Sequence, residues 1–295
     1  MGGWGSSLSQ SMSNPENTRG GPSYSLATGD AAAPRLALLN SVYGPDAERL
    51  LAQIGVPKDG GVVDFGCGTG STLPWFSRQV GPSGKLVGLD ASAAQLAVAE
   101  SACRAQGIGT VQFVEASAYQ TGLARDSFDV AHCRLLLCHL PSPEKAIAEM
   151  AAVTKPGGVV VCFDVDMASI ASYPPTDCYR KMRDIYLERR RLDGLDNDLG
   201  FKLPELMVEA GLVEPEMAII NPIYLRGDKK RLWELSFRES SARAVDRGLI
   251  DQDGLERLNA ELIAVAQDET IAVAQARMPV CWARKLQLPP LQYVP

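Results

Sequence analysis

Val63-Asp64-Phe65-Gly66-Cys67-Gly68-Thr69-Gly70 is the stretch of sequence that decides the fold class. Here the apolar run 62–65 ends in a turn with glycine at every second position, and an amphipathic segment follows. A buried strand, a glycine-rich turn and a helix in this order are typical of the first unit of a nucleotide-binding α/β domain. Glycine is needed where the backbone takes a positive φ or where a ligand approaches it closely. We therefore expect this turn to form the floor of a nucleotide cleft.

Two acidic residues flank this turn and separate two classes of ligand. Asp90 ends the next apolar run, 86–89, where its carboxylate can accept hydrogen bonds from ribose hydroxyls. Asp64 precedes the first glycine, where it would repel a pyrophosphate but suits a ligand with an ammonium group. A dinucleotide pattern would also need its third glycine at Ser71. The turn therefore favours a cationic nucleoside over a dinucleotide.

Short apolar runs alternate with amphipathic stretches on both sides of the turn. The runs that predict buried strands are 62–65, 86–89, 111–114, 128–131 and 159–163, with helices between most of them, for example at 93–106 and 143–153. After Phe163 helical patterns dominate, at 167–197, 203–210, 229–246 and 252–266, with strands expected near 216–220 and 279–285. We predict a Rossmann-like, mostly parallel seven-stranded sheet with helices on both faces and a helical cap.

This pattern also suggests how the chain is divided. Residues 1–22 are rich in Gly, Ser and Asn and are expected to form a flexible tail. Residues 23–295 are expected to form one domain, with insertions at about 165–200 and 228–270 that cap the binding crevice. The N-terminal segment could also exchange between subunits of a homo-oligomer.

Composition narrows the functional class. Acidic residues outnumber basic ones by 35 to 29, a net charge of −6 that disfavours nucleic acid as a partner. The sequence has no apolar run long enough to span a membrane and no signal-peptide pattern, so we expect a cytoplasmic protein. Its 7 cysteines are scattered and match no common metal pattern, so we expect no metal.

The ordered set of motifs resembles class I S-adenosylmethionine-dependent methyltransferases. The acidic-x-Gly-x-Gly-x-Gly turn and the acid that ends the second strand carry the resemblance, which covers roughly Tyr24 to Phe163 well. Leu140-Pro141-Ser142-Pro143 and Lys155-Pro156-Gly157-Gly158 resemble the second half of small-molecule members related to quinone-biosynthesis methyltransferases. The resemblance implies S-adenosylmethionine as cofactor.

The resemblance also implies roles for individual residues. The turn would hold the methionine half of the cofactor and Asp90 its ribose. Many members carry Gly-Asp-Ala after the third strand, where this chain has Ala116-Ser117-Ala118, so Ser117 or a backbone group would replace the usual contact with adenine. Tyr24 could close over the cofactor or simply pack. The cofactor-binding residues predicted in this way are Tyr24, Asp64, Gly66, Gly68, Gly70, Asp90, Ala91, Ser117, Ala118, Cys133 and Arg134.

Candidate catalytic groups are few. A sulfonium donor is already activated, so the protein must mainly align the reactants, exclude water and, for some acceptors, remove a proton. His139 is a candidate general base, the alternative being that it braces its loop. Asp164, just past the fifth strand, could orient a donor group or act as base, or it could serve as a cap. The scarcity of bases favours an acceptor that needs no strong deprotonation.

Two features of the expected cap can be interpreted from their spacing and charge. Trp233 and Phe237 share a helical face, so they could line a substrate wall, although core packing is the simpler interpretation. The run 189–191, three arginines flanked by acids, predicts a solvated surface.

These observations predict methyl transfer to a small hydrophobic acceptor resembling a natural product. They favour C-methylation of an electron-rich ring or an isoprenoid alkene, in the latter case with a cyclisation that could follow. O- or N-methylation of a small molecule is the nearest alternative. Two other classes also stay open: an NAD-linked oxidoreductase and a non-catalytic module that binds the methyl cofactor.

Overall fold

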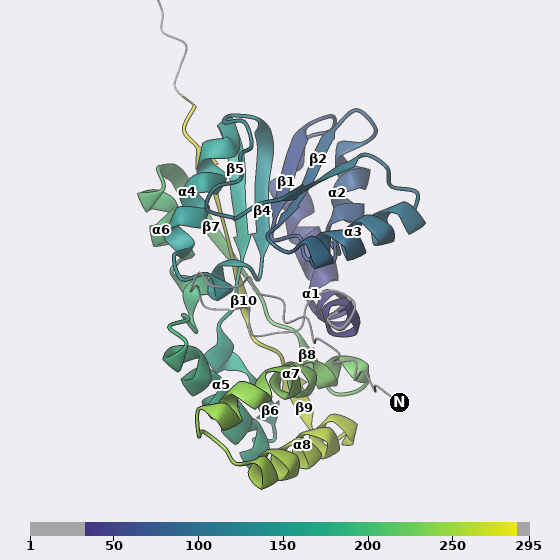
Figure 1. Cartoon of the computed structure of the whole chain (residues 1–295), viewed down its shortest axis with the longest axis vertical. Coiled ribbons are helices and arrows are strands. Elements are labelled where there is room, and N and C mark those ends of the chain that lie inside the picture. Colours follow the sequence, from purple (N-terminus) through teal and green to yellow (C-terminus); the bar gives the residue numbers. More distant parts are fainter. Residues whose placement is uncertain (1–32, 288–295) are drawn as a thin grey trace, which may run out of the picture.

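The computed structural model describes residues 33–287, and its centre is a seven-stranded sheet in the order β3-β2-β1-β4-β5-β10-β7 (Figure 1). The bounds of its strands are β1 Gly61–Phe65, β2 Lys85–Asp90, β3 Val111–Glu115, β4 Phe128–Arg134, β5 Thr154–Phe163, β7 Leu212–Ile220 and β10 Met278–Lys285. Strands β1 to β5 pair in parallel, while β10 lies antiparallel to both β5 and β7. The predicted fold class is thus confirmed.

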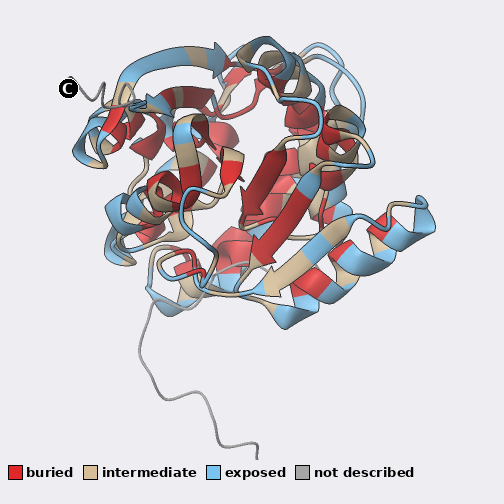
Figure 2. Cartoon of the chain, turned by 90° about the horizontal axis from the view of Figure 1, so that it is seen from above, coloured by how far each residue is buried: buried red, intermediate tan, exposed pale blue. Residues whose placement is uncertain are grey.

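Each face of the sheet has its own apolar core because alternate side chains of a strand point to opposite faces. Val62 and Val130 pack with one set of helices, α1 Ala33–Ile54, α2 Leu73–Val80 and α3 Ala93–Ala105. Val63 and Ala131 pack with the other, α4 Pro143–Val153 and α6 Leu203–Glu209. Figure 2 shows the result: the central strands are buried, and the outer sides of the helices are exposed.

Below the carboxyl ends of the parallel strands lies a second layer, the cap (Figure 1). It contains α5 Asp177–Leu192, α7 Leu232–Asp246 and α8 Gln252–Gln267. The Asp251 side chain caps the start of α8 by accepting a hydrogen bond from the Gly254 N–H at 2.7 Å. Helix α1 lies between this layer and the sheet and contacts α7.

The cap also contains a small antiparallel sheet that the sequence did not predict. Its order is β6-β9-β8, formed by Ala171–Tyr173, Ala272–Ala274 and Ile223–Tyr224. The expectation of helical structure over 167–197 was therefore wrong at Ala171–Tyr173, where β6 precedes α5. Strands this short have no periodic signature, and their pairing partners are remote in the sequence.

Within residues 33–287, no helix is both long and apolar enough to cross a lipid bilayer.

Candidate active site

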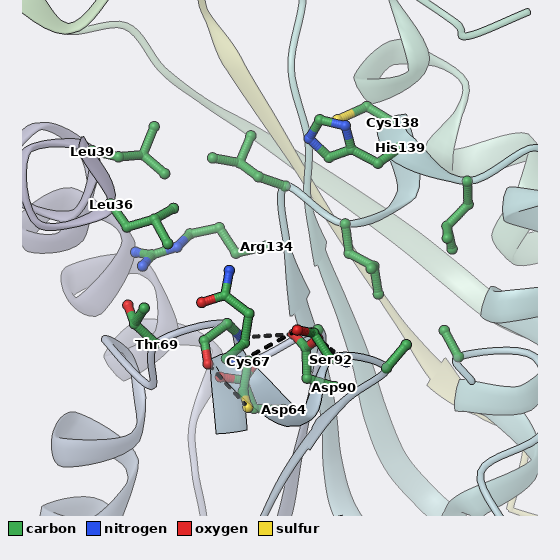
Figure 3. Close-up of a pocket in the computed structure, with 18 of the residues that line it drawn as sticks. Leu36, Leu39, Asp64, Cys67, Thr69, Asp90, Ser92, Arg134, Cys138 and His139 are labelled. Atoms are coloured by element: carbon green, nitrogen blue, oxygen red, sulfur yellow. Dashed lines mark hydrogen bonds between the residues drawn. The ribbon is translucent and has the colours of Figure 1, made fainter. Parts of the chain in front are cut away.

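A cavity of about 560 Å³ lies between the carboxyl ends of the parallel strands, helix α1 and the cap. Binding sites in open α/β sheets occupy this position, and the volume is in the range usual for small ligands. Asp64, Asp90 and Ser92 lie at one end, whereas Cys138 and His139 lie at the other, with Arg134 between the two groups (Figure 3). The cavity can therefore hold two reactants side by side.

The glycines of the turn have different roles, although all three have positive φ. A Cβ on Gly66 would come within 2.8 Å of Leu136 Cδ1, and a Cβ on Gly70 would lie 3.0 Å from Ala99 Cβ. Both residues therefore allow close packing, and Gly70 is not among the residues that line the cavity. At Gly68, φ is 55° and an added Cβ would meet no protein atom within 4 Å. Gly68 lines the cavity, so this open space is available to a ligand.

Asp64 lines the cavity, although only 3% of its surface is exposed. Its Oδ1 accepts a hydrogen bond from Nδ1 of His132 at 2.7 Å. The His132 ring is itself fully buried between Phe76 and Phe163, which fixes its orientation. One face of the Asp64 carboxylate is thus held by the protein, and the other is available to a cationic group.

Asp90 and Ala91 line the same end of the cavity. The Asp90 carboxylate accepts hydrogen bonds from the Gly68 N–H at 3.0 Å and from the Ser92 N–H at 2.9 Å. Burial raises the pKa of Asp90 above its ordinary value, although the backbone bonds oppose that rise. Each carboxylate oxygen keeps a free lone pair, so ribose hydroxyls can bind there.

Three polar or small residues, two from the loop after β3 and one from α3, complete this end. Ser117 and Ala118 line the cavity, and Ser117 Oγ accepts a hydrogen bond from the Tyr119 N–H at 3.2 Å. Gln95 also lines it, and the sequence analysis missed this residue. Gln95 is 5% exposed, and its Oε1 has no hydrogen-bond partner among residues 33–287. It is the acceptor that a buried amino group would need.

Strand β4 brings only one of its two predicted residues to the cavity. Arg134 lines the cavity, and its Nη2 donates to Asn40 Oδ1 at 2.8 Å and to Ser71 Oγ at 2.9 Å. Burial lowers the pKa of Arg134 from its usual value. Cys133 has no exposed surface and packs with the opposite core, because neighbouring residues of a strand face opposite sides.

His139 lines the far end of the cavity, but its environment disfavours a positive charge. Burial, together with the nearby cations of Arg190, Arg35 and Arg189, lowers its pKa to about 3. A group whose protonated form is so unfavourable is a poor proton acceptor at neutral pH.

The second candidate base, Asp164, does not line the cavity. It is fully buried and accepts hydrogen bonds from the N–H groups of Cys138 at 2.9 Å and Val165 at 2.8 Å. Burial raises its pKa. The structure therefore places Asp164 as a support for the loop that carries His139.

The arginine run of the cap differs from the prediction of a solvated surface. Arg190 is 1% exposed and donates hydrogen bonds to the carbonyls of Cys138 and Asp196 and to Asn197 Oδ1. Arg189 is equally buried and pairs with Asp193, and only Arg191 is exposed. The prediction was wrong for Arg189 and Arg190 because α5 turns this side toward the loop after β4.

Helices of the cap and α1 form the remaining wall. Trp233 and Tyr186 line the cavity with their rings in an edge-to-face contact, 5.8 Å between centroids. Phe237 is buried in the core and does not line the cavity. Arg35, which the sequence analysis missed, lines the wall from α1. Tyr24 and the predicted tail lie outside the described residues.

The sheet order and the position of the cavity define a Rossmann-like nucleotide-binding fold. Residues 63–162 match the family model described as "Methyltransferase domain". The chain therefore carries a methyltransferase domain of the class I, S-adenosylmethionine-dependent type, and S-adenosylmethionine is the cofactor of that domain.

Relatives agree with this family. The chain is 31% identical over 126 residues to a demethylmenaquinone methyltransferase from Geobacillus kaustophilus, covering 43% of this chain and 54% of the relative. It is 30% identical to the ubiquinone/menaquinone biosynthesis C-methyltransferase UbiE of Hahella chejuensis, covering 53% of this chain and 63% of the relative. The first curated relatives are thus matched over 45% to 62% of their own lengths.

A solved structure shows the same fold. It is a candidate methyltransferase from Bacillus halodurans, 20% identical, with a TM-score of 0.57 over 81% of this chain and 99% of that protein.

The residues at the Asp90 end fit the cofactor. The open space beside Gly68 leaves room for it, and Asp90 can bind ribose hydroxyls. The unpaired Oε1 of Gln95 is an acceptor of the kind that an adenine amino group requires.

Proposed function

We propose that this protein transfers a methyl group from S-adenosylmethionine to a small, hydrophobic organic acceptor. The observation that carries the proposal is the division of one cavity into two ends. One end holds the carboxylates of Asp64 and Asp90, and the other is walled by apolar and aromatic side chains of α1 and the cap. When bound, the cofactor supplies a methyl group activated by its sulfonium sulfur.

The residues of the chain would position the reactants rather than form bonds with them. Asp64 would hold the ammonium group of the cofactor and Asp90 its ribose, while the cap would exclude water. We take residues 165–200 and 228–270 as the cap insertions of a domain over 23–295. Tyr24 remains a candidate to close the site.

We infer that the acceptor is methylated on carbon, at an electron-rich ring or an isoprenoid alkene. The low pKa of His139 and the burial of Asp164 away from the cavity support an acceptor that needs no side-chain base. The C-methyltransferase among the relatives agrees with this inference. An alkene acceptor would pass through a carbocation, which the pocket could steer into a cyclisation. O- or N-methylation is the alternative.

We also propose that the protein acts in the cytoplasm on a small molecule rather than on nucleic acid. The net charge of −6 supports a small molecule over nucleic acid, since an acidic surface repels phosphate backbones.

Isothermal titration with S-adenosylhomocysteine and with NAD is the first test. We expect saturable binding of S-adenosylhomocysteine alone, and binding at least about tenfold weaker in Asp90→Asn. The exposed Asp184→Asn variant is the matched control and should bind as the wild type does. Binding of NAD in place of S-adenosylhomocysteine would support an oxidoreductase instead. Tritium transfer from labelled S-adenosylmethionine to a panel of phenols, quinols and prenyl compounds then tests catalysis.

A further inference from the structure

Two residues that line the cavity carry a buried hydrogen-bond donor with no acceptor among residues 33–287. Arg35 is 6% exposed, and its Nη2 has no hydrogen-bond partner in the described part of the chain, 33–287. Trp233 is 4% exposed, and its Nε1 likewise has no partner among those residues. Both side chains line the cavity. Leaving a buried donor unpaired is unfavourable, so such groups commonly await a ligand or water.

An ion pair links the two elements that carry these donors. Arg35 Nε on α1 donates to Glu239 Oε2 on α7 at 2.7 Å, and Trp233 lies on the same helix α7. The guanidinium is therefore held in one orientation, in which Nη2 has no acceptor among residues 33–287. Arg35 can be understood as a fixed donor rather than a flexible surface cation.

The charges around this end favour an anion over a cation. Burial is the main cause of the low pKa of His139, and the cations of Arg190, Arg35 and Arg189 lower it further, so three positive charges act at this ring. Three acids of this region already pair with arginines, Glu239 with Arg35, Asp193 with Arg189, and Glu234 with Arg231 and Arg238. Arg35 Nη2 and Trp233 Nε1 are both donors, so neither can accept a hydrogen bond from an ammonium group, whereas an oxygen anion can accept from both.

The surrounding wall is apolar. Four apolar or aromatic side chains line the cavity together with Arg35 and Trp233. They are Leu36 and Leu39 of α1, Met167, and Tyr186. An acceptor that fills this space must therefore have a hydrophobic body, with the polar group confined to one position.

We propose that the acceptor carries an anionic oxygen, as a carboxylate, phenolate or enolate, which accepts hydrogen bonds from Arg35 Nη2 and Trp233 Nε1. This inference rests on the methyltransferase function proposed above and names the class of acceptor. Such an acceptor binds already deprotonated, so it needs no base from His139 or Asp164. In a phenolate or enolate the charge also enriches the adjacent carbon in electrons.

Binding of two probes to the protein saturated with S-adenosylhomocysteine tests the proposal. The probes are 2-naphthoate, which has an apolar body and an anionic oxygen, and 2-naphthalenemethanol, its neutral counterpart. We expect 2-naphthoate to bind at least about tenfold more tightly than the alcohol, because an ionised acceptor strengthens both hydrogen bonds.

The variants then assign the preference to the two donors. Arg35→Met should weaken 2-naphthoate binding at least about tenfold, and Trp233→Phe, which keeps an aromatic wall, about threefold to tenfold. Matched controls are Arg49→Met on the exposed side of α1 and Trp282→Phe, whose indole N–H bonds to Glu216 on the surface. Both controls should bind 2-naphthoate as the wild type does. If Arg35→Met fails to fold, the affinity of Trp233→Phe for 2-naphthoate alone tests the proposal.

The outcomes separate this inference from the proposed function. A wild-type protein that does not bind S-adenosylhomocysteine would overturn the proposed function. With that binding intact, three results would overturn the anion site: no saturable binding of 2-naphthoate, equal affinity for the two probes, or unchanged affinity in both cavity variants.

Discussion

Nδ1 of His132 lies 2.7 Å from Oδ1 of Asp64, and both side chains are buried beneath the glycine turn. His132 holds the carboxylate that faces the cavity, although it does not itself line the cavity. It therefore acts on the ligand through Asp64.

Replacing His132 by Phe should weaken cofactor binding without opening the core. The Phe ring can keep the ring contacts with Phe76 and Phe163 but cannot donate to Asp64. A hydrogen bond to a charged group contributes about 1.5–3 kcal/mol, so we expect S-adenosylhomocysteine to bind roughly tenfold or more weakly by titration calorimetry. Unchanged affinity in a folded variant would show that Asp64 needs no support from His132.

Gly68→Ala should abolish cofactor binding while costing little stability. Its Cβ would meet no protein atom, so the cost in folding is that of the positive φ alone, about 1 kcal/mol. Gly107→Ala is the matched control, because it has φ of 72° and equally open surroundings but does not line the cavity. Both variants should lose similar stability by urea unfolding, and only Gly68→Ala should lose affinity for S-adenosylhomocysteine. Equal affinity in the two variants would contradict this role of Gly68.

His139 should make the folded state less stable in acid. Its pKa is about 3 in the folded protein and near 6.5 when exposed, so the unfolded chain takes up a proton first as pH falls. Stability should therefore fall as pH decreases below 6.5, by up to about 1.4 kcal/mol per pH unit from this group. Between pH 7 and 5 the wild type should lose about 2 kcal/mol more than His139→Gln in urea unfolding. Parallel losses would mean that His139 is protonated in the folded state.

Arg190→Met should destabilise the protein strongly, whereas Arg191→Met should not. Removing Arg190 leaves one buried and two partly buried acceptors without their donor, a cost on the order of 3 kcal/mol. Arg191 is exposed and pairs only with Glu188, so its variant should keep the wild-type midpoint of urea unfolding. Similar midpoints for the two variants would contradict the burial of Arg190.

The elements that could be predicted from sequence are those whose pattern is local. The run 62–65 is buried on both faces and shows its strand character without help from distant residues. The fold class and the methyltransferase family followed from such local signals. The strands β6, β8 and β9 form by pairing with segments far away in the sequence, so no local pattern predicts them.

Side-chain placement was harder to predict for the same reason. Cys133 and Arg134 are neighbours in sequence but lie on opposite faces of β4. Cys133 therefore packs in the core, whereas Arg134 lines the cavity. Arg35 reaches the cavity because α1 docks against α7, a tertiary contact that sequence spacing does not encode. The predicted catalytic roles of His139 and Asp164 stay predictions, although neither environment favours a base.

The small sheet of the cap imposes an order on folding during synthesis of the protein. The glycine turn, Asp90 and Arg134 leave the ribosome within one stretch of chain, whereas β9, which pairs with both β6 and β8, emerges only at residues 272–274. A nascent chain can therefore assemble the nucleotide-binding strands well before the three segments of the cap meet. The acceptor end of the pocket therefore takes shape later than the nucleotide end.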